Sequence, residues 1–154
     1  MAERAVETPV HFSQYVVEPN IDELRSNPNS LKAAFNCVMS IDALAGHIYI
    51  FLKGLRMTPL NRDSDFRHEL ANQSHSYRVI VDAAKTYKHI ELEGAAIIKS
   101  ADQTKVASRP YGVGAFGVGS FGGEDVMIEL NDGTKKHCIS EANTAHKFLL
   151  SQLP

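Results

Sequence analysis

The sequence predicts an α+β fold, in which a helical bundle is followed by a small antiparallel sheet and a closing helix. Residues 30–56 and 64–92 repeat their apolar side chains with helical spacing, which predicts two long antiparallel helices. Residues 126–130 alternate as a strand does, and Asp132-Gly133 then predicts a tight hairpin with a return strand. Ser140 is a good N-cap for a last helix.

Length and composition favour one globular domain spanning residues 1–154. The chain has 154 residues, of which 44% are hydrophobic and 22% are charged, so wholesale disorder is excluded. We divide it into a bundle (12–93), a glycine-rich segment with the hairpin (95–139) and the C-terminal helix (140–153). The formal net charge of -2 excludes a global positive field that would attract nucleic acid, although a local basic patch remains possible.

Several features predict a cytoplasmic location without membrane association. The N-terminus lacks the apolar run of a secretory signal, and no apolar stretch reaches the roughly 20 residues that cross a bilayer. Cys37 and Cys138 are far apart in sequence and belong to no zinc-binding or disulfide pattern, so we interpret both as packed thiols.

The first long helix, 30–56, is apolar over most of its circumference, so we expect it at the centre of the bundle. Asp42 falls on its apolar side, where a carboxylate is costly unless it is paired. An antiparallel hairpin centred near Leu60 would bring residue 42 opposite residue 78. We therefore predict an ion pair between Asp42 and Arg78, with His75 as a second choice. The alternative is that the helix turns enough to leave Asp42 in water.

The second long helix, 64–92, has a weak point at residues 73–76 and is expected to end at Gly94. One side of it carries a stripe of polar side chains. We call these residues the polar stripe: His68, Asn72, His75, Arg78, Asp82, Lys85 and His89.

The polar stripe has two interpretations. It lies opposite the apolar face and could simply be hydrated, with weak surface ion pairs. Alternatively, Arg, Asp, Lys and His together are the groups that bind phosphate and transfer protons. Because helix geometry places Arg78, Asp82 and His89 on one side, we predict that they form one polar cluster. His75, Lys85 and Asp42 are candidate binding residues.

Other site types have little support in the sequence. Histidines seven residues apart are separated by about 10.5 Å of helix rise, and a His-x3-His pair is absent, so we predict no metal and no cofactor. No serine lies in a G-x-S-x-G turn, which argues against a serine hydrolase of that type. In the glycine-rich segment, Tyr111, Phe116 and Phe121 are expected to be buried anchors rather than part of a phosphate loop.

Residues 78–92, RVIVDAAKTYKHIEL, resemble a helix of uncharacterised bacterial proteins, with Asp82, two alanines, the Lys88-His89 pair and Leu92. Such proteins often continue into an Asp-Gly hairpin and a final helix, and many are similar to the HEPN bundles, which include RNases of toxin and phage-defence systems. The HEPN signature is an Arg with a polar neighbour, followed by a His with four to six residues between the Arg and the His. Arg62 and His68 match it, with five residues between them.

The resemblance implies a homodimer whose two-fold interface completes a site. A metal-independent RNase or a nucleotide-binding or nucleic-acid-binding protein would use Arg78, Asp82, Lys88 and His89, or alternatively Arg62 and His68. The other class is a non-catalytic module that binds a protein partner, or serves a structural role, through the polar stripe.

Overall fold

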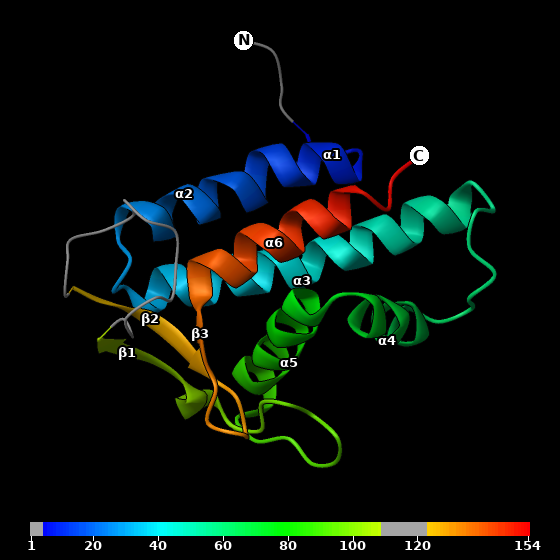
Figure 1. The fold of residues 1–154 in the computed structure, drawn as a ribbon. Helices are drawn as coiled ribbons and strands as arrows, with labels where there is room; N and C mark the ends of the chain where they lie inside the picture. Colours follow the sequence, from blue (N-terminus) through cyan, green and yellow to red (C-terminus); the bar gives the residue numbers. More distant parts are fainter. Residues whose placement is uncertain (1–4, 109–122) are drawn as a thin grey trace, which may run out of the picture.

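The computed structural model describes residues 5–108 and 123–154 and has the predicted α+β architecture. The chain begins with α1 (Pro9–Phe12), a π-helical turn η1 (Ser13–Val17) and α2 (Glu18–Ser26). Figure 1 shows these elements lying along the central helix α3 and the last helix α6, while α4, α5 and the sheet lie below them. Tyr111, Phe116 and Phe121, which we predicted to be buried anchors, lie outside the described residues.

The central helix α3 (Leu31–Gly54) starts at Ser30, whose hydroxyl accepts a hydrogen bond from the Ala33 amide at 3.1 Å. Twelve of its residues are buried, which confirms the prediction of a core helix packed by neighbours on several sides. By length and composition alone α3 could cross a membrane, but more than half of its most apolar window is buried inside the molecule. A core helix of a soluble protein passes the same test.

The second long helix is in fact two helices, α4 (Asp63–Gln73) and α5 (His75–His89), which are separated at the weak point that the sequence indicates at residues 73–76. Ser74 separates them with an extended backbone, and its hydroxyl accepts the amide hydrogen bond of Tyr77 at 3.2 Å. A serine side chain can cap a new helix in this way, in competition with continuation of the old one. Figure 1 shows that α4 and α5 consequently run in different directions.

Helix α5 also ends before the predicted Gly94. Ile90 has φ 66° and ψ -51°, and the Glu91 amide donates to the His89 carbonyl at 2.7 Å, so the chain leaves the helix in a γ-turn. Gly94 has a positive φ of 82° but lies in the following loop. The helix therefore ends at an exposed isoleucine, which sequence rules do not favour at such a position.

The sheet contains β1 (Thr104–Ser108), β2 (Glu124–Glu129) and β3 (Lys135–His137) in that spatial order, with antiparallel pairing throughout. The predicted hairpin is confirmed: Gly133 has φ 85°, and the Leu130 amide donates to Thr134 at 2.8 Å. Strand β1, which follows a short 3-10 turn η2 (Ala101–Gln103), was not predicted. Helix α6 (Cys138–Leu150) starts directly after β3, two residues before the predicted Ser140.

Candidate functional site

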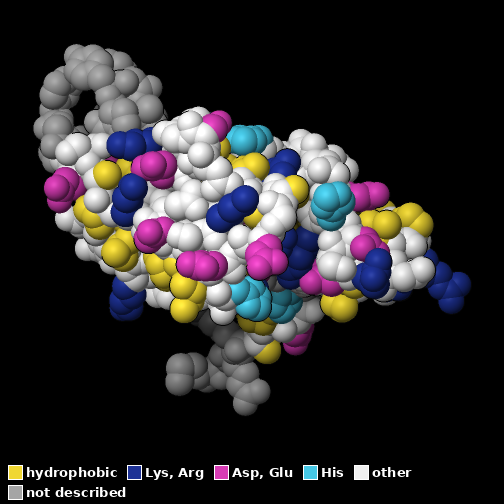
Figure 2. Space-filling view, turned by 90° about the horizontal axis from the view of Figure 1, so that it is seen from below, with side chains coloured by type: hydrophobic (Ala, Val, Ile, Leu, Met, Phe, Trp, Pro, Cys, Tyr) yellow, Lys and Arg dark blue, Asp and Glu magenta, His cyan; other side chains and the backbone are white. Residues whose placement is uncertain are grey.

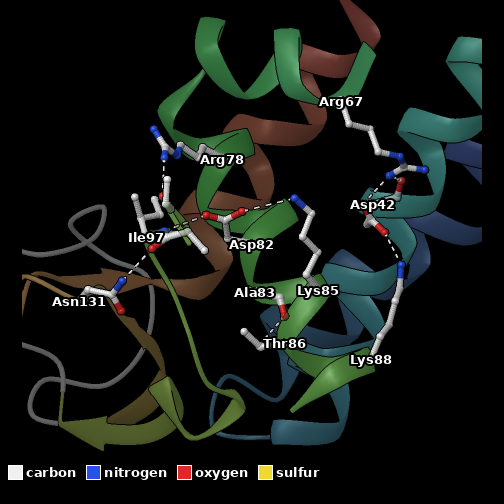
Figure 3. Close-up of polar contacts among 12 residues, drawn as sticks. Asp42, Arg67, Arg78, Asp82, Ala83, Lys85, Thr86, Lys88, Ile97 and Asn131 are labelled. Carbon is white, nitrogen blue, oxygen red and sulfur yellow. Dashed lines mark hydrogen bonds and ion pairs between the residues drawn. The ribbon is translucent and has the colours of Figure 1, made fainter. Parts of the chain in front are cut away.

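Asp42 is buried on α3, as expected, but its partners are Arg67 of α4 and Lys88 of α5. One carboxylate oxygen accepts from Nη1 of Arg67, and the other accepts from Nζ of Lys88 at 2.9 Å (Figure 3). The predicted pair with Arg78 is wrong. Placing residue 78 opposite residue 42 assumed that residues 64–92 form one unbroken helix antiparallel to α3. The break at Ser74 changes the direction of α5, and Lys88 in the last turn of α5 therefore reaches Asp42.

Arg67 is the centre of a network that the sequence did not indicate. Its Nε donates to Asp63 at 2.7 Å, and its Nη1 also donates to the Asp42 carbonyl at 2.5 Å. Burial disfavours its charged form, but the neighbouring Asp42 and Asp63 carboxylates, together with Tyr77, outweigh this and raise the pKa of Arg67. A Cβ on Gly46 would lie 2.8 Å from Nη2, so glycine leaves the space that this guanidinium fills.

Tyr77 lies beside the same network. Its ring is fully buried, and burial raises the pKa of its hydroxyl, with Arg67 opposing and Asp42 adding to the shift. Among the described residues, that hydroxyl has no hydrogen-bond partner. Arg67, Asp42 and Tyr77 therefore form a largely internal cluster that holds α3, α4 and α5 together.

On another side of α5, Arg78 and Asp82 bind the segment that follows the helix. Nη2 of Arg78 donates to the Ala95 carbonyl at 3.0 Å, and Asp82 accepts the Ile97 amide at 2.9 Å. Asn131 of the hairpin extends this connection. Its side-chain Nδ2 donates to the Ala96 carbonyl at 2.8 Å, and its backbone N–H donates to the Ile97 carbonyl at 2.9 Å (Figure 3).

A hollow of about 450 Å³ lies between α4, α5 and residues 92–96. We call it the α4–α5 hollow. It brings together four basic or histidine side chains, because the turn at Ser74 places the two halves of the polar stripe on its opposite walls: Arg67, His68, Arg78 and Lys85. Its acidic lining residues are Asp63, Asp82 and Glu93.

The remaining candidate residues lie elsewhere. Lys88, His89 and His75 are exposed and do not line the α4–α5 hollow, so Arg78 and Asp82 share one site without His89. Arg62 precedes α4 and pairs with Asp65 at 3.0 Å. One chain therefore does not assemble Arg78, Asp82, Lys88 and His89 around a common point, and it does not bring Arg62 to His68 within this hollow.

The surface around this region carries no uniform charge. Figure 2, which views the molecule from the side of α4 and α5, shows cationic and acidic side chains interspersed over this face, with histidine side chains in its central and right-hand parts. In the part of the chain that the structure describes, no group of three or more His, Cys, Asp or Glu side chains is arranged to hold a metal ion.

Compared with models of protein families, with curated proteins and with solved structures, the chain has no match.

Proposed function

We propose that the α4–α5 hollow binds a small phosphate-bearing molecule, namely a mononucleotide or the end of an RNA strand. The observation that carries this proposal is the convergence of His68, Arg78 and Lys85 on one hollow, from two helices. Arginine, lysine and protonated histidine are the side chains that bind phosphate oxygens.

Two of the three acidic lining residues also make contacts within the protein. Asp63 accepts from Arg67, and Asp82 accepts the Ile97 amide. The Nζ atom of Lys85 is 3.8 Å from Asp82, which is ion-pair range but beyond a hydrogen bond, so its three donors can turn to a ligand. Glu93 is exposed and lowers the affinity for an anion without blocking the hollow.

The size and charge of the site favour a small ligand over a long polynucleotide. A volume of about 450 Å³ is within the range of small-molecule sites. A protein that follows a nucleic-acid backbone needs a continuous basic track, whereas this chain has a net charge of -2 and a mixed surface (Figure 2).

The test is calorimetric titration with adenosine monophosphate, adenosine and inorganic phosphate. We expect both phosphate-bearing compounds to bind and adenosine to bind at least tenfold more weakly. Lys85→Ala should weaken binding tenfold or more, because one charge-assisted contact to phosphate is lost. Lys99→Ala, which removes an exposed lysine outside the hollow, is the matched control and should have no effect. Equal binding by adenosine, or an unchanged affinity of Lys85→Ala, would contradict the proposal.

The resemblance to the HEPN bundles leads us to propose in addition a cytoplasmic homodimer, because its site would be completed at a two-fold interface. Light scattering on the same samples measures the oligomeric state. RNA cleavage by the wild type that disappears in His68→Ala or His89→Ala would add RNase activity to phosphate binding. A protein that binds neither nucleotide nor RNA would instead favour a module that recognises a protein partner through the polar stripe.

A further inference from the structure

A second polar cluster lies at the junction of the sheet with α6, away from the α4–α5 hollow. Nε2 of His137, the last residue of β3, is 2.8 Å from Oδ2 of Asp125 on β2. Its Nδ1 is 3.0 Å from Oγ of Ser140 in the first turn of α6. The acid and the imidazole are almost fully buried, at 2% and 3% exposure, whereas Ser140 is partly exposed.

Hydrogen-bond chemistry determines how the protons are arranged in this cluster. An ionised carboxylate only accepts, so His137 must carry its hydrogen on Nε2 and donate it to Asp125. In the neutral ring Nδ1 then has a lone pair, and the hydroxyl of Ser140 is the donor. Asp125 thus fixes the tautomer in which His137 can accept a proton from Ser140.

The position of Ser140 adds a third element. It is the third residue of α6, a helix of 13 residues whose N-cap residue, His137, does not cap a backbone N–H of the first turn with its side chain. The first N–H groups of an α-helix have no partner within it, and they face its N-terminal end with a partial positive charge. A negative oxygen that develops beside Ser140 would therefore meet backbone donors.

We propose that Ser140 is a nucleophile for acyl transfer, with His137 as general base and Asp125 as the residue that orients it. The substrate class is a small activated acyl ester. Oγ of Ser140 forms a bond to the acyl carbon while its proton passes to Nδ1 of His137. The tetrahedral oxyanion then collapses, the bond to the leaving alkoxide breaks, and His137 returns the proton to it. Water hydrolyses the acyl-serine by the same proton route in reverse.

No sequence motif indicates this arrangement, because a G-x-S-x-G turn is absent and the three residues come from β2, β3 and α6. In serine proteases the acid binds Nδ1 and the serine binds Nε2. Here the two ring nitrogens exchange these roles, and either nitrogen of a neutral imidazole can act as the base.

The test uses two reagents on the full chain: a fluorophosphonate, which phosphonylates an activated serine with loss of fluoride, and p-nitrophenyl acetate. We expect labelling of one site, located at Ser140 by peptide mass spectrometry, and release of p-nitrophenol above the rate without protein. Asp125→Asn should slow labelling on the order of 100-fold or more, because the tautomer is no longer fixed. Ser151→Ala, at the other end of α6, is the matched control and should leave labelling unchanged.

Ser140→Ala should abolish both reactions while it keeps the far-ultraviolet circular dichroism spectrum and melting temperature close to the wild type, since the side chain is small and partly exposed. Two outcomes overturn the proposal. One is a folded wild-type protein that the fluorophosphonate does not label. The other is a Ser140→Ala protein that is labelled as fast as the wild type, which would place the reactive group elsewhere.

Discussion

At the scale of single residues, the core of this protein depends on how one buried carboxylate is compensated. The side chain of Asp42 is 7% exposed, and two cations from different helices share its two oxygens. Arg67 is largely enclosed at 19% exposure, whereas Lys88 is at 45%. Because solvent screens an exposed ion pair, the partner that matters for stability is Arg67.

We predict that Asp42→Ala lowers the free energy of unfolding by about 3 kcal/mol, because the mostly buried Arg67 guanidinium loses its buried counterion and keeps only the more exposed Asp63. A double-mutant cycle of Asp42 with Arg67 should give a coupling of about 2 kcal/mol, and one with Lys88 less than about 1 kcal/mol. Urea titration followed by circular dichroism measures these values. The cycle with Arg78 is the control and should show no coupling. Comparable coupling to Arg78 would contradict the assignment of Arg67 and Lys88 as the partners of Asp42.

The burial of Asp42 could be predicted from the sequence, because the angular position of a residue on a helix follows from its number. Its partners could not be predicted, because they depend on the direction in which α5 leaves Ser74. Arg67 was missed for a similar reason. The role of Arg67 depends on its contacts with Asp63, Gly46 and Asp42, and the sequence of α4 alone does not indicate the two contacts on α3.

At the scale of elements, the beginning of α5 follows ordinary rules and its end does not. Ser74 is a favoured N-cap, and the weak point at residues 73–76 was visible in the sequence. At the other end, Ile90 holds φ 66° with a β-branched side chain that is 71% exposed. Such a conformation costs on the order of 1–3 kcal/mol, and the side chain recovers little of this by burial. No sequence rule places a helix end at isoleucine.

We predict that Ile90→Gly stabilises the protein by about 1 kcal/mol, because glycine adopts a positive φ without steric conflict. Its greater freedom in the unfolded chain offsets part of the gain. Ile90→Ala is the control: it removes the same exposed side chain but keeps the Cβ atom, so it should not stabilise. Thermal unfolding by calorimetry compares the three proteins. If both variants shift the melting temperature equally, strain at this residue is not the cause.

At the scale of the whole molecule, local signals predicted the class of fold and long-range contacts determined the rest. The core helix α3 and the hairpin at Gly133 arise from patterns within about 25 residues, and both were predicted. Strand β1 is held by its pairing with β2, from Thr104 opposite Ile128 to Ser108 opposite Glu124. The Asp125–His137–Ser140 cluster likewise depends on long-range structure, because it forms only when β2 pairs with β3 and α6 follows β3.

A last long-range contact joins the N-terminal helices to α6 and makes the global stability depend on pH. Nε2 of His146 is 2.7 Å from the hydroxyl of Ser13 in the π-helical turn, and that hydroxyl also donates to Glu18 at 3.3 Å. Burial lowers the pKa of His146 below its usual value near 6.5, with Glu18 opposing the shift and Lys147 adding to it. The folded state therefore binds this proton less readily than the unfolded state does.

The stabilisation that follows is fully present above the unfolded pKa near 6.5 and is lost as the pH falls below it, because protonation then favours the unfolded chain. We predict that the wild type loses more free energy of unfolding between pH 7.5 and pH 5.5 than His146→Gln does. Glutamine retains a side chain that can hydrogen-bond to Ser13 but does not titrate. Urea titrations of both proteins at the two pH values give the difference, and contributions from carboxylates cancel between them. Equal losses in the two proteins would show that His146 keeps an ordinary pKa in the folded state, and that this contact leaves the stability independent of its protonation.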